Sequence, residues 1–262
     1  MSCNVVFWVG VKSDSPELLK KHGNFNYFEY SKLSWKYWCL KNNVIFHEYT
    51  TPSILDTNKH RVTWQRWFDL EKELSSYNWE KVLVIDASTI IRWDAPNMFD
   101  LSQNQISAFR SLENVNWINQ GVVGYQHLFN DVNFDLKKYI NCGFQILTKE
   151  HLKFLQILKE FYLNNLEEIL KLQSSVNRGT DQPVYNFLLQ KHNVNVYYNL
   201  PPTFFIMHMN RFNWFNHNWQ LNEDTTPYFI KYGYIWIYSG FDRTQRNELM
   251  KQTWQIIQHQ YE

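Results

Sequence analysis

The chain has 262 residues, 26 of them basic and 25 acidic, and its formal charge is +1. General nucleic-acid binding needs a basic surface that displaces counterions, so we expect no nucleic-acid partner. Aromatic residues make up 18% of the chain and include 12 Trp, which predicts a large core; some of these rings are also suited to lining a groove for a sugar or a base.

The cysteines and the apolar run near the N-terminus indicate the cellular compartment to expect. Cys3, Cys39 and Cys142 are widely spaced and form neither a zinc pattern nor a disulfide framework. The apolar run Asn4–Val11 is about eight residues long and stops at Lys12, which is too short for a signal sequence or a membrane span. We therefore expect a cytoplasmic protein without a membrane span.

The first third of the chain alternates expected strands with expected helices. Asn4–Val11, Val44–Tyr49 and Val82–Ile85 are apolar runs that read as buried strands. Between them, Leu33–Leu40 and Thr63–Leu74 place apolar residues at roughly the helical period. The alternation is typical of βαβ units and predicts an α/β protein with a largely parallel sheet.

The rest of the chain continues with strands and helices, and no repeat or low-complexity linker divides it. We therefore expect a single domain over residues 1–262. Thr148 is a candidate N-cap for a long helix that breaks near Asn164 and Asn165, and Asp242 with Gln245 resembles a capping box before the last helix. The remaining expected elements are a helix over Asp181–Gln190 and strands over Phe144–Leu147, Val194–Tyr197, Phe204–Met207 and Tyr234–Tyr238.

Asp86 directly follows the expected buried strand Val82–Ile85. In open parallel sheets, ligands bind beyond the carboxyl ends of the strands. A carboxylate buried there needs a partner such as a metal ion, a hydroxyl or backbone N–H groups. The other reading is that Asp86 only caps the turn after its strand.

Several stretches together resemble a known family. VLVIDASTIIRWDAPNMF (82–99) resembles the central motif of GT-A fold glycosyltransferases, in which a strand ends in Asp-x-Asp. YINCGFQIL (139–147) resembles the strand that lies beside the donor sugar in that family, and RGTDQPVYN (178–186) resembles its Asp-Gln helix start. TWQRWF (63–68) is similar to the helix before the Asp-x-Asp strand, and YIWIYSGFDRTQRNELMKQTW (234–254) to the C-terminal motif.

The resemblance implies a GT-A (Rossmann-like) three-layer fold, with a central mixed, mostly parallel sheet flanked by helices. It implies a nucleotide-binding half over residues 1–100 and a half for the donor sugar and the acceptor over 101–262. The implied activity is a hexosyl- or pentosyltransferase that moves a sugar from a nucleoside-diphosphate sugar to a glycan or another hydroxyl acceptor.

The resemblance also implies roles for particular residues. Asp181 and Gln182 would be catalytic, and their Asp-Gln pair, with Asn141-x-Gly143, resembles retaining families. Loop Asn210–Asp224 is the expected acceptor loop, with Trp214, His217 and Trp219. The residues expected to bind the nucleotide and the donor sugar are Val9, Gly10, Val11, Lys12, Thr50, Arg61, Arg66, Asp86, Ala87, Ser88, Asn141, Cys142 and Gly143.

The sequence departs from the family where Mn²⁺ or Mg²⁺ is usually held. The second Asp of the motif is Ser88, and the late His of the family is Ile237. A hard cation prefers several oxygen ligands with anionic charge, so the metal is in doubt. Three readings stay open. Asp86 and His208 could still hold a metal, a cationic side chain (Lys12, Arg61, Arg66 or Arg178) could replace it, or the protein binds a nucleotide sugar or glycan without transfer.

Overall fold

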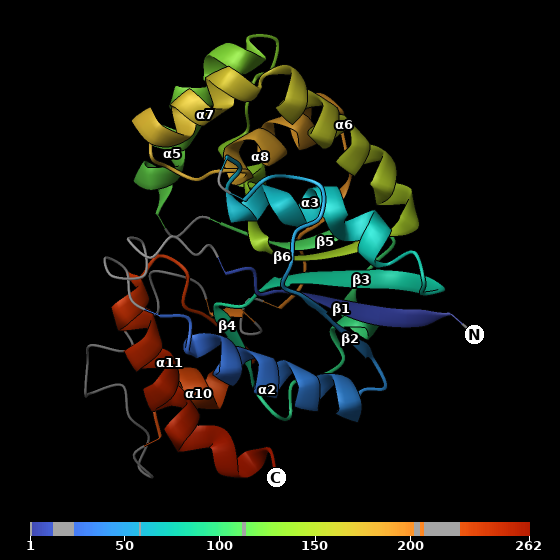
Figure 1. The fold of residues 1–262 in the computed structure, drawn as a ribbon, viewed down its shortest axis with the longest axis vertical. Coiled ribbons are helices and arrows are strands. Elements are labelled where there is room, and N and C mark those ends of the chain that lie inside the picture. Colours follow the sequence, from blue (N-terminus) through green and yellow to red (C-terminus); the bar gives the residue numbers. More distant parts are fainter. Residues whose placement is uncertain (1, 13–23, 58, 112–113, 202–204, 207–225) are drawn as a thin grey trace.

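The computed structural model of the chain describes residues 2–12, 24–57, 59–111, 114–201, 205–206 and 226–262. A six-stranded sheet lies at its centre, with helices above and below it (Figure 1). The three-layer α/β architecture that the sequence predicts is therefore confirmed.

The central sheet is mixed. β1, β2 and β3 run parallel to one another, β6 runs antiparallel to both β3 and β5, and β7 is parallel to β5. In spatial order the strands are β2 (Ile45–Tyr49), β1 (Cys3–Val9), β3 (Trp79–Asp86), β6 (Ile140–Thr148), β5 (Ile106–Arg110) and β7 (Val196–Tyr197). The carboxyl ends of the parallel strands and the start of β6 thus share one edge of the sheet.

A second, three-stranded sheet joins the region after Asp86 to the C-terminal part of the chain. It consists of β4 (Thr89–Ile91), β9 (Ile235–Ile237) and β8 (Phe205–Ile206). β4 begins three residues after Asp86, and Thr89 pairs with Ile237. The C-terminal segment is thereby fixed beside the end of β3.

Helices cover both faces of the central sheet (Figure 1). One face carries α3 (Val62–Glu73), α5 (Val115–Tyr125), α6 (Leu152–Asn164), α7 (Leu166–Ser175) and α8 (Gln182–Lys191). The other carries α2 (Tyr27–Lys41), α4 (Met98–Leu101), α10 (Tyr228–Tyr232) and α11 (Arg243–Ile257). Short 3₁₀ turns are η1 (Gln126–Phe129), η2 (Leu136–Lys138), η3 (Lys149–His151) and η6 (Gln258–Gln260).

Each face of the sheet has its own hydrophobic core, because successive strand residues point to opposite sides. In β1, Phe7 packs in the core under α3 and α6, while Trp8 packs in the core under α2 and α11. Six Trp side chains are almost completely buried in these cores: Trp8, Trp35, Trp38, Trp64, Trp67 and Trp236. Five of these rings serve the core alone at the edge of the sheet where the parallel strands end, whereas Trp8 also lines a cavity beyond the ends of β1 and β2.

Several expected element boundaries agree with the structure. The helical region after β6 breaks at Asn165, between α6 and α7. The side chain of Asp242 accepts a hydrogen bond from the N–H of Gln245 at 2.9 Å and caps α11. Thr148 is an N-cap as expected, but it precedes the short η3, which leads into α6. Helix α2 begins at Tyr27, six residues before the expected start at Leu33.

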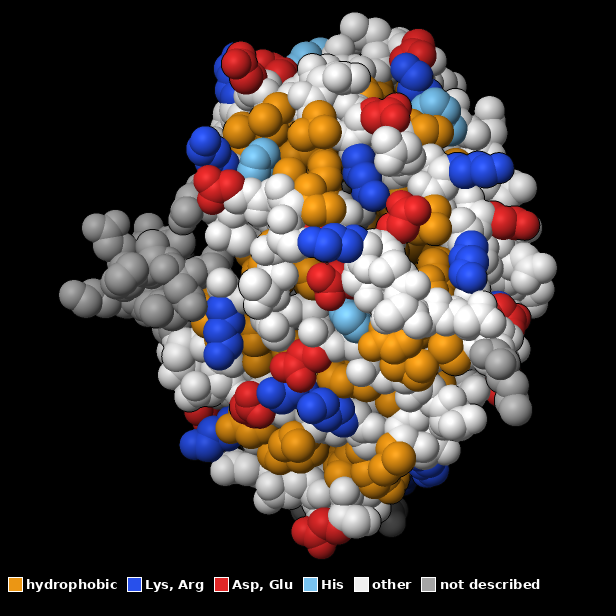
Figure 2. Space-filling view, turned by 45° about the vertical axis from the view of Figure 1, so that its right-hand side comes forward, with side chains coloured by type: hydrophobic (Ala, Val, Ile, Leu, Met, Phe, Trp, Pro, Cys, Tyr) orange, Lys and Arg blue, Asp and Glu red, His pale blue; other side chains and the backbone are white. Residues whose placement is uncertain are grey.

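The surface agrees with the balanced composition. On the face in Figure 2, acidic and basic side chains are interspersed, so no large field of one sign covers it. Among the described residues, no helix combines the length and the apolar character needed to cross a lipid bilayer.

Candidate active site

A cavity of about 240 Å³ lies at the end of β3. Val9 and Asp86 are register partners on β1 and β3, and the N–H of Ala87 donates to the carbonyl of Val9 at 3.0 Å. These contacts align the carboxyl ends of the two strands at the cavity. The residues from the sequence prediction that line it are Val9, Val11, Arg66, Asp86, Ala87 and Ser88.

Arg66 on α3 contacts both a carboxylate that lines the cavity and a carboxylate buried in the protein interior. Its Nη1 donates to Oδ1 of Asp86, and its Nη2 donates to Oδ2 of Asp181 at 2.9 Å. The guanidinium also lies over the ring of Trp67, 4.7 Å from the ring centre. The side chains of Arg66 and Asp181 are 2% and 3% exposed, whereas that of Asp86 is 30% exposed. Asp86 is therefore the solvent-facing end of a buried ion triad.

Asp181 precedes α8 as predicted, but its carboxylate does not cap the helix. Its Oδ2 accepts from Nε1 of Trp67 at 2.7 Å in addition to Arg66, and Oδ1 accepts from the hydroxyl of Thr180 at 3.2 Å. The carboxylate is enclosed by α3 and does not line the cavity. Its direct contact is with Arg66, so it acts on the cavity through that side chain.

The start of β6 lies close beside the carboxylate of Asp86. A Cβ atom at Gly143 would lie 2.9 Å from Oδ2 of Asp86 and 2.9 Å from Oδ1 of Asn141. The same Oδ1 accepts from the N–H of Gly143 at 2.7 Å. Gln182 at the start of α8 accepts from the N–H of Cys142 at 3.1 Å. The motifs around Asp86, Gly143 and Asp181 therefore meet at one place, as the resemblance implies.

Burial and neighbouring charges set the ionisation of the triad. Burial raises the pKa of Asp86, Arg66 and Arg246 oppose this effect, and Asp181 adds to it. Burial acts to lower the pKa of Arg66, but Asp86 and Asp181 together raise it above its ordinary value. Burial also raises the pKa of Cys142 well above the ordinary thiol value. Cys142 therefore stays a thiol and is not a nucleophile at neutral pH.

A second cavity, of about 370 Å³, lies beyond the ends of β1 and β2 and contains Gly10, Lys12 and Thr50. Phe28 of α2 lines both cavities. A Cβ atom at Gly10 would lie only 2.0 Å from the ring of Trp8, so this position needs glycine. Nine of the residues predicted to bind the nucleotide and the donor sugar are thus divided between two neighbouring cavities.

The remaining predicted residues lie elsewhere. Arg61 precedes α3 and lines neither cavity. Arg178 lines neither and donates to Oε1 of Gln120 on α5 at 2.7 Å. The candidate acceptor residues Trp214, His217 and Trp219 and the candidate metal ligand His208 lie outside the described residues.

The described side chains at this cavity do not fit a divalent cation. Oδ1 of Asp86 already accepts from Arg66, and Ser88 supplies a single neutral oxygen. Ile237 is 3% exposed and paired with Thr89 inside the small sheet, so this position offers no ligand. Within the described ranges, no three His, Cys, Asp or Glu side chains are grouped to hold a metal.

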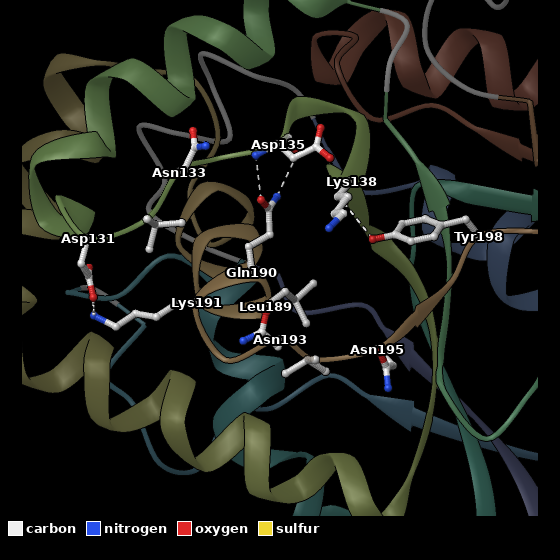
Figure 3. Close-up of a pocket in the computed structure, with 12 residues that line it drawn as sticks. Asp131, Asn133, Asp135, Lys138, Leu189, Gln190, Lys191, Asn193, Asn195 and Tyr198 are labelled. Carbon is white, nitrogen blue, oxygen red and sulfur yellow. Dashed lines mark hydrogen bonds and ion pairs between the residues drawn. The ribbon is translucent and has the colours of Figure 1, made fainter.

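A third cavity, of about 380 Å³, lies at the C-terminal end of α8 and contains none of the predicted site residues (Figure 3). Its polar groups are largely engaged with one another. Lys191 pairs with Asp131 at 2.9 Å, and the amide of Gln190 bonds to both the N–H and the carbonyl of Asp135. These contacts fix the loop before β6 to α8, so we assign this cavity a structural role.

Two residues near the site were not expected from the sequence. Asp69 accepts from the hydroxyl of Tyr49 at 2.6 Å and from the hydroxyl and N–H of Ser53, which fixes the loop containing Thr50. Arg246 on α11 lines the cavity at Asp86. The only signal for Arg246 was its presence in the C-terminal motif, and nothing in the sequence pairs Asp69 with Tyr49.

Of three comparisons with known proteins, one finds similar folds. A scan against protein-family models finds no match, and a search of curated proteins finds none either. Among solved structures, a glycosyltransferase involved in the glycosylation of the major capsid of PBCV-1 matches 95% of this chain and 99% of its own, with a TM-score of 0.58 and 14% identity. The galactosyltransferase LgtC, solved with donor and acceptor sugar analogs, matches 96% of this chain and 99% of its own, with a TM-score of 0.48 and 15% identity. The glycosyltransferase GlyE of Streptococcus pneumoniae TIGR4 covers 100% of this chain and 63% of its own, with a TM-score of 0.47 and 14% identity.

The likeness to the PBCV-1 glycosyltransferase extends over almost the whole of both chains and concerns the fold. Together with the mixed sheet and its flanking helices, it establishes that the chain has the GT-A fold of glycosyltransferases. The fold that the sequence motifs imply is therefore confirmed.

Proposed function

We propose that the protein is a glycosyltransferase that moves a sugar from a nucleoside-diphosphate sugar to a hydroxyl group of a glycan or another acceptor. The observation that carries this proposal is the meeting of Val9, Asp86, Gly143 and Asp181, from four distant parts of the chain, at one edge of the sheet. Ligands bind at this edge in open α/β folds. The transferred group would be a hexosyl or pentosyl unit.

The two neighbouring cavities suit the two ends of such a donor. The cavity with Gly10, Lys12 and Thr50 would take the base and ribose, and the cavity at Asp86 and Ser88 would take the diphosphate. The donor sugar would then lie against the start of β6, where Gly143 leaves room beside Asp86.

We further propose that transfer needs little or no divalent metal. In the usual arrangement a cation neutralises carboxylates and the departing diphosphate together. Here Arg66 pairs with Asp86, which weakens the repulsion between that carboxylate and a diphosphate, although Arg66 is shared with Asp181. This argument favours Arg66 among the cationic replacements for the metal.

The arrangement favours retention of configuration. Inversion needs a carboxylate that removes the proton of the acceptor hydroxyl. Asp181 is enclosed by Arg66 and Trp67, and Asp86 is the one carboxylate among the described residues that line the cavity. In the retaining path, the bond between the anomeric carbon and the β-phosphate oxygen breaks, and its electron pair stays on the phosphate. The acceptor oxygen bonds to the same face of that carbon, and its proton passes to the phosphate oxygen.

A second candidate is a protein that binds a nucleotide sugar or glycan without transferring the sugar. Ser88 in place of the second Asp and the buried Ile237 in place of the His favour this candidate. The two candidates predict the same binding and differ in turnover.

The test is the release of nucleoside diphosphate from a panel of UDP-, GDP-, CDP- and dTDP-sugars, with and without EDTA. Wild-type protein should release nucleoside diphosphate from at least one donor at a similar rate in EDTA. Asp86→Asn should lose the activity, whereas Asp100→Asn, which changes an exposed carboxylate on α4, should keep it. Binding of a donor without release would favour the second candidate, and no binding would reject both.

The location stays a proposal as well. Cys3, Cys39 and Cys142 are all free thiols, which is typical of a reducing compartment such as the cytoplasm.

A further inference from the structure

Arg246, on the first turn of α11, lines the cavity at Asp86 together with residues of α3. We propose that Arg246 binds the diphosphate of the donor and supplies the positive charge that a metal ion would otherwise provide there. This inference rests on the proposed function, but it concerns a residue to which neither the sequence motifs nor the metal-replacement argument gives a role.

The guanidinium of Arg246 is held in place by the protein backbone. Its Nε donates to the carbonyl of Tyr238 at 2.9 Å, and its Nη2 donates to the carbonyl of Phe241 at 3.0 Å. Its Nη1 donates to the hydroxyl of Tyr27 at 3.0 Å, and the group lies 5.1 Å from the centre of that ring. A cation fixed in this way needs little reorganisation when an anion binds.

The hydrogen-bond count leaves donors for a ligand. A guanidinium has five N–H groups, one on Nε and two on each Nη. The contacts to Tyr238, Tyr27 and Phe241 use one N–H on each nitrogen. Within the described part of the chain, one N–H on each Nη therefore remains, and two such donors match a pair of phosphate oxygens.

The ion pairing around the cavity also leaves Arg246 available to an anion. Arg66 is offset by Asp86 and Asp181, so this triad carries one net negative charge. Arg246, by contrast, forms no ion pair with any carboxylate in the described part of the chain, although its charge is close enough to oppose the rise that burial causes in the pKa of Asp86. Arg246 is thus a cation without a direct carboxylate partner among the described residues, and a phosphate group could pair with it.

Arg246 would act in both binding and transfer. When the bond from the anomeric carbon breaks, negative charge grows on the β-phosphate, and a fixed cation stabilises it. The Arg66–Asp86 pair lines the same cavity and limits repulsion between the carboxylate and the diphosphate. The two arginines thereby divide the tasks that a bridging metal ion performs.

The experiment measures binding by calorimetry in EDTA, with UDP, GDP, CDP and dTDP, the matching nucleosides, and inorganic pyrophosphate as ligands. In Arg246→Gln, the affinity for the nucleoside diphosphate that binds wild-type protein most tightly should fall about tenfold to hundredfold, because charged hydrogen bonds to an anion are lost. The affinity for pyrophosphate should fall by about the same factor. Affinity for the nucleoside should stay unchanged. Lys251→Gln removes one positive charge from an exposed site on the same helix and should alter none of these affinities.

Arg246 also bonds to backbone carbonyls, so thermal unfolding of each variant accompanies the titrations. If Arg246→Gln does not fold, Arg246→Lys is the substitute, because lysine keeps the positive charge but lacks the paired N–H donors of the guanidinium. Its affinity for the nucleoside diphosphate should be about threefold to tenfold lower than that of wild-type protein. Diphosphate affinity equal to wild type in a folded variant, or an equal loss for nucleoside and diphosphate, would overturn the role of Arg246 and leave the proposed function standing. Absence of any nucleotide binding by wild-type protein would overturn both.

Discussion

Nη2 of Arg66 lies 2.9 Å from Oδ2 of Asp181, inside the protein, where neither side chain is more than 3% exposed. The other arm of the same guanidinium reaches Asp86 at the cavity. A residue at the start of α8 therefore controls the position of a carboxylate at the end of β3, through one arginine on α3. This connection makes the site sensitive to changes that do not touch the cavity itself.

Replacing Asp181 tests this connection. Asp181→Asn should abolish transfer, because Arg66 loses its buried ion pair with the carboxylate of residue 181. Nucleotide binding should stay measurable, because the residues that line the nucleotide cavities are unchanged. Removing one partner of a buried ion pair should also lower the free energy of unfolding by about 3–5 kcal/mol, measured by urea denaturation. Asp131→Asn breaks the exposed pair with Lys191 and should change neither quantity. Wild-type turnover by Asp181→Asn would remove Asp181 from the site.

Replacing Gly143 tests whether the site needs the space that a glycine leaves beside the Asp86 carboxylate. The Cβ atom in Gly143→Ala would lie 2.9 Å from Oδ2 of Asp86, so the carboxylate must move. We expect at least a tenfold loss of donor turnover and a loss of stability of about 1–3 kcal/mol from overpacking. Gly124→Ala on α5 is the matched control, since its Cβ would lie 2.6 Å from Val176, away from the cavity, and should cost stability but not turnover. Equal turnover in the two variants would contradict the role of Gly143.

Replacing Tyr49 tests whether the loop that contains Thr50 contributes to nucleoside binding. In Tyr49→Phe, Asp69 loses the hydrogen bond at 2.6 Å, and the free energy of unfolding should fall by about 1 kcal/mol. The hydroxyl of Tyr30 makes no hydrogen bond within the described ranges, so Tyr30→Phe should leave stability unchanged. Nucleoside affinity should fall in the first variant only. A nucleoside affinity that Tyr49→Phe does not change would separate this loop from the nucleotide.

His151 predicts a pH dependence of stability. It is 9% exposed, and its Nδ1 accepts from the N–H of Thr148 at 2.9 Å, which a protonated ring cannot do. Burial lowers the pKa of His151 below the ordinary value of 6.5. Below pH 6.5 the unfolded chain thus binds more protons than the folded one, and the free energy of unfolding should fall as the pH falls through this value.

Denaturation of wild-type protein and His151→Gln between pH 7.5 and 5 (roughly, the range over which a histidine titrates) measures this effect. Glutamine supplies an acceptor without a proton to gain, so the variant should lose less stability on acidification. Parallel stability curves for the two proteins would show that His151 does not contribute.

Much of the fold could be predicted because the early strands and helices alternate with clear periods. Elements that the sequence did not indicate are stabilised mainly by tertiary contacts. Helix α5 (Val115–Tyr125) is rich in Val, Asn and Gly, which are poor helix formers, and it is held by the burial of Ile118, Val122 and Tyr125. Strand β4 has only three residues and depends on its pairing with β9. The antiparallel direction of β6 is not visible in an apolar run, which reads the same in either direction.

The site was predictable in part for similar reasons. A strand-end carboxylate and glycine in a strand are local signals, and Asp86 and Gly143 were found from them and from the family motif. Contacts between distant side chains leave no such signal. Nothing in the sequence indicates that Asp181 faces Arg66 rather than the end of its own helix, or that Arg246 of the last helix faces the cavity at Asp86.

The most direct test of the central claim is a crystal structure of the protein soaked with UDP, GDP, CDP or dTDP compounds in the presence of EDTA. The account predicts a diphosphate in the cavity between Ser88 and Arg246, with the base beyond the ends of β1 and β2 near Thr50. Compounds found at an unrelated place, or crystals that take up none of them, would contradict it.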